Sequence, residues 1–347
     1  MTGTLAQKVV VRNPYKGLFN GIAVMTAGKG ILVVLGFVNK VLLAKIMNPE
    51  SLGLFGLTLS IFGLTFMMAN MGAHNAHVYN IVRNRISVAR SFGFSIVFAT
   101  ITGLIGACLL YLIYISWLDG LYFKSITISS SVMLVYFFLF IPSNIIKTHL
   151  VEILIGLKKF KIHNGFMIVE SVLFLMILAS LYSVVGGGLF VGLTAWTSSV
   201  FIVSIGLIAY ILHQYGVMFS SVINDAKIIL PYGLKCFSAG LFQSLMVRFD
   251  ILLVAFFLDA TITGTYYLAA SLSVSLNSIT IPLNRVVYTY LCNLKLNEGI
   301  QLTNRAFKMS LYSGLSLLVV FIPIIIKTIP FIFGELYSQS GQVQKVL

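Results

Sequence analysis

The sequence predicts an all-α polytopic membrane protein with about nine transmembrane helices. Of its 347 residues, 59% are hydrophobic and only 9% are charged, whereas soluble proteins carry about 25% charged residues. So few charges cannot cover the surface of a soluble fold, and apolar runs long enough to cross a bilayer recur along the chain. Lysine and arginine also gather in alternate loops, which is typical of polytopic membrane proteins.

Nine apolar stretches approach or exceed the roughly 20 residues that a spanning helix needs. They cover residues 18–46, 50–79, 88–117, 126–151, 162–185, 187–213, 229–258, 262–291 and 303–333. Sequence typical of turns separates several of them: MNPES lies between the first two, LDG follows the third, and VVGGG parts the fifth from the sixth. Several stretches approach thirty residues, which indicates helices that tilt or extend beyond the bilayer.

The two sides of the predicted bundle carry very different numbers of basic residues. Loops on one side hold Lys8, Arg12, Lys16, Arg83, Arg85, Arg90, Lys158, Lys159, Lys161, Lys227, Lys295, Arg305 and Lys308, whereas the other side holds Lys124 and Lys345. By the positive-inside rule, we expect the N-terminus to be cytoplasmic. The same rule explains the net charge of +14, so this charge predicts no nucleic-acid partner.

One loop divides the predicted helices into two groups. The stretch QYGVMFSSVINDAKI, at 214–228, is the longest predicted cytoplasmic loop and the most polar stretch between helices. We therefore expect an N-terminal six-helix lobe over residues 1–213, a cytoplasmic linker over 214–228, and a partial C-terminal lobe of about three helices over 229–347.

A weak internal repeat relates the two groups. Sliding the chain on itself by 211 residues (264 − 53 = 211) places Asn39 on Asp250, Gly53 on Gly264, Ser60 on Ser271 and His74 on Arg285. The first three predicted helices thus resemble the last three in the same orientation. Parallel repeats of this kind occur in transporters built from two like halves.

Four stretches carry a resemblance to a known family. They are NKVLLAKIMNPESLGLFGLTLSI, MGAHNAHVYNIVRNR, VRFDILLVAFFLDATITGTYYLAASL and PFIFGELY. In their order and spacing, the sequence resembles the polysaccharide flippases of the multidrug/oligosaccharidyl-lipid/polysaccharide (MOP) superfamily, in particular O-antigen and capsule repeat-unit flippases. The resemblance implies a MATE-like pair of six-helix lobes that face each other as a V. Because the chain stops at the point equivalent to the ninth helix, we expect the second lobe to be incomplete, through truncation or as a shortened variant.

The resemblance also implies a function. It predicts a transporter in the bacterial inner membrane that flips an oligosaccharide linked to a polyprenyl diphosphate, of the undecaprenyl type, for synthesis of O-antigen, lipopolysaccharide or capsule. Such a protein has the membrane lipid and the lipid-linked oligosaccharide as partners. A polysaccharide polymerase and chain-length proteins are further candidate partners.

Charged residues inside the predicted helices are the candidate site residues, because a charge at the bilayer centre is costly unless it faces a cavity or a partner. Arg248 lies near the middle of its helix and is a candidate for binding an anionic headgroup. Asp250 is only two positions further along, so the two side chains point to nearly opposite faces of the helix. They are poor partners for each other, and Asp250 is a candidate for coupling to a cation or proton. A salt bridge to another helix is the alternative for each.

Three further cations are candidate substrate ligands. Lys29 and Lys40 are eleven residues apart, almost three whole turns, so they share one face of the first helix and suit a phosphate-bearing substrate. Arg285 follows Pro282, which should kink its helix. Snorkelling to the interface or headgroup binding are the alternatives for these cations. Glu170 is a second ion-coupling candidate, with a structural ion pair as its alternative.

The remaining charged residues and the cysteines indicate no metal site, cofactor site or enzyme active site. Lys147, His149 and Glu152 close the fourth predicted helix, where we expect them to anchor it at the interface. Cys108, Cys236 and Cys292 lack metal-ligand spacing, so we expect neither a metal nor a cofactor. The sequence contains no H-E-x-x-H, phosphate-loop or G-x-S-x-G motif, so we predict no enzyme activity.

Two alternatives to a flippase remain at this stage. The first is a cation-coupled multidrug exporter of the same superfamily, which would favour acidic residues in the cavity. The second is a membrane polysaccharide polymerase or glycosyltransferase, which would need larger outer loops or an acidic cluster in a loop.

Overall fold

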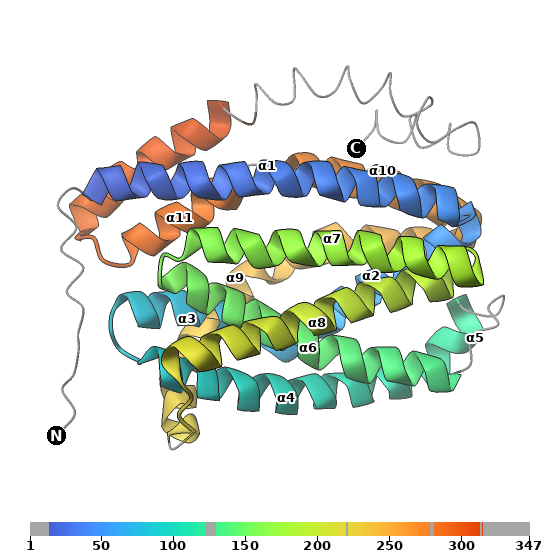
Figure 1. The fold of residues 1–347 in the computed structure, drawn as a ribbon, viewed down its shortest axis with the longest axis horizontal. Helices are drawn as coiled ribbons and strands as arrows, with labels where there is room; N and C mark the ends of the chain where they lie inside the picture. Colours follow the sequence, from blue (N-terminus) through green and yellow to red (C-terminus); the bar gives the residue numbers. More distant parts are fainter. Residues whose placement is uncertain (1–13, 123–129, 220, 278–280, 313, 315–347) are drawn as a thin grey trace.

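In the computed structural model, long helices run side by side along one axis (Figure 1). The structure describes residues 14–122, 130–219, 221–277, 281–312 and 314, and no β-strand occurs among them. The helices are α1 (Pro14–Ile46), α2 (Pro49–Asn70), α3 (Ala73–Val82), α4 (Val88–Ile113), the π-helical turn η1 (Tyr114–Leu118), α5 (Asp119–Tyr122), α6 (Ser130–Gly156), α7 (Phe160–Val185), α8 (Leu189–Tyr215), α9 (Val222–Phe257), α10 (Ala260–Asn277) and α11 (Ile281–Leu291). A further helix spans residues 296–312.

The predicted fold class is confirmed. Within the described part of the chain, seven helices are long and apolar enough to cross a membrane: Gly17–Ile46, Pro49–Asn70, Val88–Leu118, Ser130–Gly156, Phe160–Val185, Leu189–Tyr215 and Val222–Phe257. Their apolar residues lie on the outer as well as the inner face. On α4, for example, Ile101, Ile105 and Leu109 are more than half exposed. A helix that is apolar on all faces suits lipid on its outer side.

The predicted second helix, 50–79, is two helices. Asn48 caps the start of α2 by accepting a hydrogen bond from the Ser51 amide at 2.8 Å, directly before Pro49. The helix then ends because Met71 and Gly72 both take left-handed φ angles, of 49° and 66°. These angles break the α-helical ladder, and α3 starts in a new direction.

Other boundaries also differ from those predicted. Helix α9 begins at Val222, seven residues before the predicted start at 229. Asp225 explains the earlier start, because this buried residue of the first turn forms an ion pair with Arg90 of α4 and accepts a hydrogen bond from Ser221. Most of the predicted ninth helix, 303–333, lies outside the described residues.

The first turns of α2 and α10 cross so closely that only glycine fits. A Cβ on Gly53 would lie 2.0 Å from the carbonyl oxygen of Ala260, and a Cβ on Gly264 would lie 1.9 Å from that of Pro49. The 211-residue shift that relates the two glycines also relates Pro49 to Ala260, so the contact is reciprocal. A two-fold axis between two repeats requires such a reciprocal pair, which supports the internal repeat.

This crossing lies at one end of the bundle. The turn from α1 to α2 is at the right of Figure 1, whereas the turn from α6 to α7, which carries Lys158, Lys159 and Lys161, is at the left. Helix α1 packs against α7 and α11, α2 packs against both α9 and α10, and α3 also packs against α9. The two groups of helices therefore meet mainly through α1, α2, α3, α9, α10 and α11.

Candidate functional site

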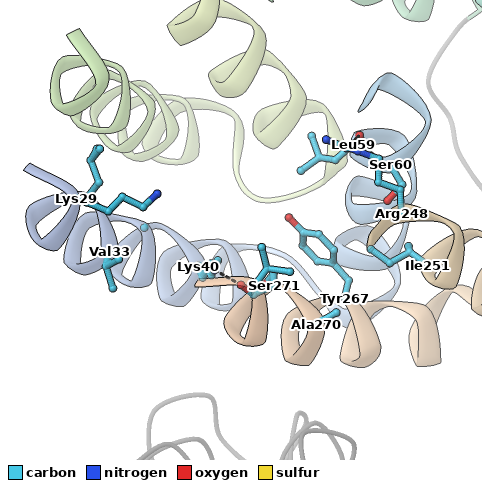
Figure 2. Close-up of a pocket in the computed structure, with 13 residues that line it drawn as sticks. Lys29, Val33, Lys40, Leu59, Ser60, Arg248, Ile251, Tyr267, Ala270 and Ser271 are labelled. Carbon is cyan, nitrogen blue, oxygen red and sulfur yellow. Dashed lines mark hydrogen bonds between the residues drawn. The ribbon is translucent and has the colours of Figure 1, made fainter. Parts of the chain in front are cut away.

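A cavity of about 390 Å³ lies between the two groups of helices, further from the end of the bundle than the α2–α10 crossing. Its walls come from α1, α2, α9 and α10 (Figure 2). The structure brings three predicted site residues together here: Lys29, Lys40 and Arg248. The other residues that line it are Leu32, Val33, Gly36, Leu59, Ser60, Ile251, Tyr267, Ala270, Ser271 and Val274. The described residues of the lining include no Asp or Glu, so their charge is cationic.

Two of these cations contact backbone carbonyl groups of the opposite repeat. Lys40 of α1 donates a hydrogen bond to the carbonyl oxygen of Ser271 in α10, as Figure 2 shows. Arg248 of α9 approaches the carbonyl oxygen of Leu59 in α2, with 3.4 Å between Nη1 and that oxygen. Each repeat thus provides, from its first helix, a cation that contacts the second helix of the other repeat.

Gly63 provides the space for the Arg248 guanidinium. A Cβ on Gly63 would lie 1.6 Å from Nη1 of Arg248. The guanidinium therefore occupies space that any other residue type at position 63 would fill. The placement of Arg248 depends on this glycine of α2.

Lys29 has no hydrogen bond or ion pair to any residue that the structure describes. It lies on the same face of α1 as Lys40, as the eleven-residue spacing predicts, and Figure 2 shows its amino group turned toward the cavity. Lys29 also lines a second cavity of about 330 Å³, so the two cavities adjoin at this residue. Its ammonium group is available to an anion in either cavity.

The second cavity contains charges of both signs. Arg285 of α11 forms an ion pair with Glu152 of α6, and Lys147 forms an ion pair with Glu170 of α7 at 2.7 Å. The residues that line this cavity are Met25, Lys29, Leu32, Asn144, Lys147, Thr148, Val151, Glu152, His163, Asn164, Met167, Ile281, Pro282 and Arg285. The two cavities together are lined by five lysine or arginine side chains and one carboxylate.

The two predicted ion-coupling residues lie elsewhere. Asp250 accepts a hydrogen bond from the Tyr266 hydroxyl at 2.8 Å. Glu170 accepts one from Lys147 through Oε1, while its buried Oε2 has no hydrogen-bond partner among the described residues. Neither carboxylate lines the two cavities. Arg248 and Asp250 have different partners, which confirms that they do not pair with each other.

The expected interfacial anchoring of Lys147, His149 and Glu152 is wrong. His149 is fully buried and Glu152 is 4% exposed. The predicted helix ended at residue 151, whereas α6 continues to Gly156, so these residues lie more than a turn deeper. Had the predicted helix extended to Gly156, Lys147 and Glu152 would have been recognised as charges inside a membrane span. A charge inside a span is the feature by which Arg248 was selected as a candidate.

A buried chain of polar groups was not predicted at all. His77 Nδ1 lies 2.6 Å from the Ser91 hydroxyl, His77 Nε2 lies 2.9 Å from His149 Nδ1, and His149 Nε2 lies 3.0 Å from Asn70 Oδ1. These four residues come from α2, α3, α4 and α6, and each is at most 1% exposed. No sequence signal links them, because every contact is between different helices.

Comparisons with known proteins agree with this architecture. The family model described as "Polysaccharide biosynthesis protein" matches residues 18–295. Searching curated proteins finds no match to the chain.

Solved structures of transporters share the fold. An outward-facing multidrug resistance MATE family transporter of the MOP superfamily is 17% identical, with a TM-score of 0.64, and the match covers 96% of this chain and 77% of that one. A Vibrio cholerae MATE transporter is 14% identical, with a TM-score of 0.66, and the match covers 96% and 78%. A MOP superfamily transporter from Pyrococcus furiosus, for which a binding pocket of reverse polarity is described, is 16% identical, with a TM-score of 0.56 and coverage of 96% and 76%.

Proposed function

Because this chain belongs to the polysaccharide biosynthesis protein family and shares the fold of MATE transporters, we propose that it is a membrane transporter of the MOP superfamily rather than an enzyme, and that it moves an oligosaccharide linked to a polyprenyl diphosphate across the bacterial inner membrane. Transfer of a sugar chain and a diphosphate through hydrocarbon is very costly, so a polar cavity must shield them. The transported unit serves assembly of a surface polysaccharide such as O-antigen or capsule, upstream of a polymerase. The basic loops face the cytoplasm, and with them the N-terminus.

The observation that carries this proposal is the excess of cations over carboxylates in the two adjoining cavities. Lys29, Lys40 and Arg248 line a cavity that has no acidic residue. A diphosphate carries several oxygen acceptors, and charge-assisted hydrogen bonds from arginine and lysine to phosphate are among the stronger polar contacts. Arg248 suits bidentate recognition of the phosphate, while Lys29 contributes an ammonium group that no described residue engages. Arg285 adds a cation in the second cavity.

The proposed transport cycle uses two lobes. The first ends with α8 at Tyr215 and the second begins with α9 at Val222, so the link between them is the short segment between these helices rather than the whole of 214–228. The α2–α10 crossing holds the lobes together at the end of the bundle opposite the basic loops. Separation of this crossing would open the cavity toward the outer side, as alternating access requires.

Complementation of a flippase-deficient strain tests the proposal. We expect Lys29→Gln and Arg248→Gln to reduce surface polysaccharide at least about tenfold and to cause lipid-linked repeat units to accumulate. The matched control is Lys308→Gln, because this exposed lysine lies in the helix 296–312, away from both cavities. Full complementation by Arg248→Gln at normal expression would remove Arg248 from the mechanism.

A cation-coupled drug exporter is the second candidate, favoured by the multidrug MATE transporter among the similar structures. Such an exporter would use carboxylates in the cavity, whereas Asp250 and Glu170 have partners elsewhere. Drug resistance on overexpression that depends on Asp250, without any effect on surface polysaccharide, would favour the exporter.

A further inference from the structure

A third cavity, of about 390 Å³, lies at the end of the bundle that carries the basic loops. It is formed by the start of α1, the turn between α6 and α7, and the end of α11, and it shares no lining residue with the two cavities already described. Three lysines within four consecutive residues line it: Lys158, Lys159 and Lys161. The remaining described lining residues are Gly17, Asn20, Gly21, Val24, Phe160, Ile162 and Tyr290, so no acidic residue is found among them.

The local backbone directs the first two lysines in different directions. Lys158 takes a left-handed φ of 58°, a conformation that usually favours glycine. Its amino group lies 4.1 Å from the centre of the Tyr290 ring in α11. The amino group of Lys159 instead donates a hydrogen bond to the Tyr210 hydroxyl of α8 at 3.2 Å. The turn therefore presents its cations on a framework that includes α8 and α11.

Two glycines of α1 bring the helix close to this framework. A Cβ on Gly17 would lie 2.8 Å from the Tyr290 hydroxyl oxygen, and a Cβ on Gly21 would lie 2.8 Å from the Phe160 ring. The wall formed by α1 thus lacks side chains at the positions nearest the two rings. Val24, Ile162 and the rings add apolar surface, so the cavity combines cations with an apolar lining.

The cavity lies at the ends of two candidate membrane-spanning segments. Lys158 lies between two spanning segments, one ending at Gly156 and the next beginning at Phe160. Burial lowers the pKa of the Lys158 ammonium from its usual value, and no described carboxylate forms an ion pair with it. Basic pockets between transmembrane helices at the cytoplasmic boundary are suited to anionic headgroups.

We propose that this cavity binds the phosphate of an acidic phospholipid, with Lys158 and Lys161 as its cationic ligands and the apolar wall against the glycerol and first acyl carbons. The bound lipid touches α1, α7 and α11 together and stabilises their contact. This inference concerns a site separate from the transport cavity, so it does not depend on the proposed function.

Thermal unfolding of the purified full chain in a neutral detergent tests the proposal. We expect phosphatidylglycerol to raise the midpoint of unfolding in a saturable way, whereas phosphatidylcholine and millimolar inorganic phosphate leave it unchanged. Lys158→Gln/Lys161→Gln should bind phosphatidylglycerol about thirtyfold more weakly, since two lysines near the headgroup are removed. The matched control, Lys295→Gln/Lys308→Gln, removes two exposed lysines that do not line this cavity and should bind as the parent does.

Three results would overturn the inference. Equal stabilisation by phosphatidylcholine would show that the charge of the headgroup is irrelevant. Equal stabilisation by inorganic phosphate would assign the cavity to a soluble anion rather than a lipid. Equal loss of binding in both double variants would show that only the overall surface charge matters. Unfolding midpoints without lipid establish that each variant is folded before its lipid response is compared.

Discussion

Gly53 of α2 and Gly264 of α10 are related by the internal repeat, and each packs against the backbone of the other's helix at one crossing. Such reciprocity is expected of residues next to a two-fold axis. It places the axis of the repeat at the point where the two groups of helices touch most closely. Any movement that separates the groups at this end must first break this contact.

Enlarging either glycine should open the crossing. We expect Gly53→Val and Gly264→Val each to destabilise the protein by about 1–3 kcal/mol, because the added side chain meets backbone that cannot move independently. Each should also increase labelling of a cysteine placed at position 271, in a background without the native cysteines, by an impermeant maleimide added from outside. In Gly30→Val, whose Cβ would meet nothing within 4 Å, labelling should stay at the parental level. Unchanged labelling in both valine variants would refute a gate here.

Replacing Gly63 should act through Arg248. We expect Gly63→Ala to reduce transport nearly as much as Arg248→Gln, because the new methyl group takes the position of the guanidinium. Stability should change little, since the side chain that must move is long and flexible. The control is Gly36→Ala, which lines the same cavity but has open space around it. Surface polysaccharide measures the outcome, and normal transport by Gly63→Ala would show that the position of Arg248 is unimportant.

The ion pair between Glu152 and Arg285 should contribute to stability through charge compensation. Arg285→Gln leaves the buried Glu152 carboxylate without its cation, so we expect a loss of about 1–3 kcal/mol. Glu152→Gln should cost less, because Arg285 is partly exposed. The double variant should recover part of the loss, and a double-mutant cycle on thermal unfolding measures the coupling. Additive single effects would show that the pair contributes nothing.

The buried chain through His77 and His149 should stabilise the junction of α2, α3, α4 and α6. Asn70→Ala removes the acceptor for His149 Nε2, and we expect a loss of about 1–3 kcal/mol from the unpaired buried nitrogen. His77→Ala should cost at least as much, because it also interrupts the contact with Ser91. His213→Ala, at an exposed position near the end of α8, serves as the control. Equal unfolding midpoints for all three variants would contradict this role.

Much of the site was predictable where it depends on helical periodicity. The spacing of eleven positions from Lys29 to Lys40 places both on one face of α1, and they do line one cavity. Arg248 and Asp250 are two positions apart, and their side chains contact different helices, as predicted. By contrast, the buried positions of His149 and Glu152 were missed, because a boundary error of five residues in α6 moves a side chain by more than one turn.

The sequence by itself determined the fold class, the approximate spans and the repeat, because each depends on hydropathy or on spacing along one chain segment. Only the tertiary structure decided which charges meet. Whether Arg285 pairs with Glu152, or Lys147 with Glu170, depends on which faces of the helices meet when they pack. This orientation is set by tertiary contacts and cannot be read from either segment alone. Packing also decided that Gly53 and Gly264 meet at one crossing, since the close approach of two backbones is a property of both helices together.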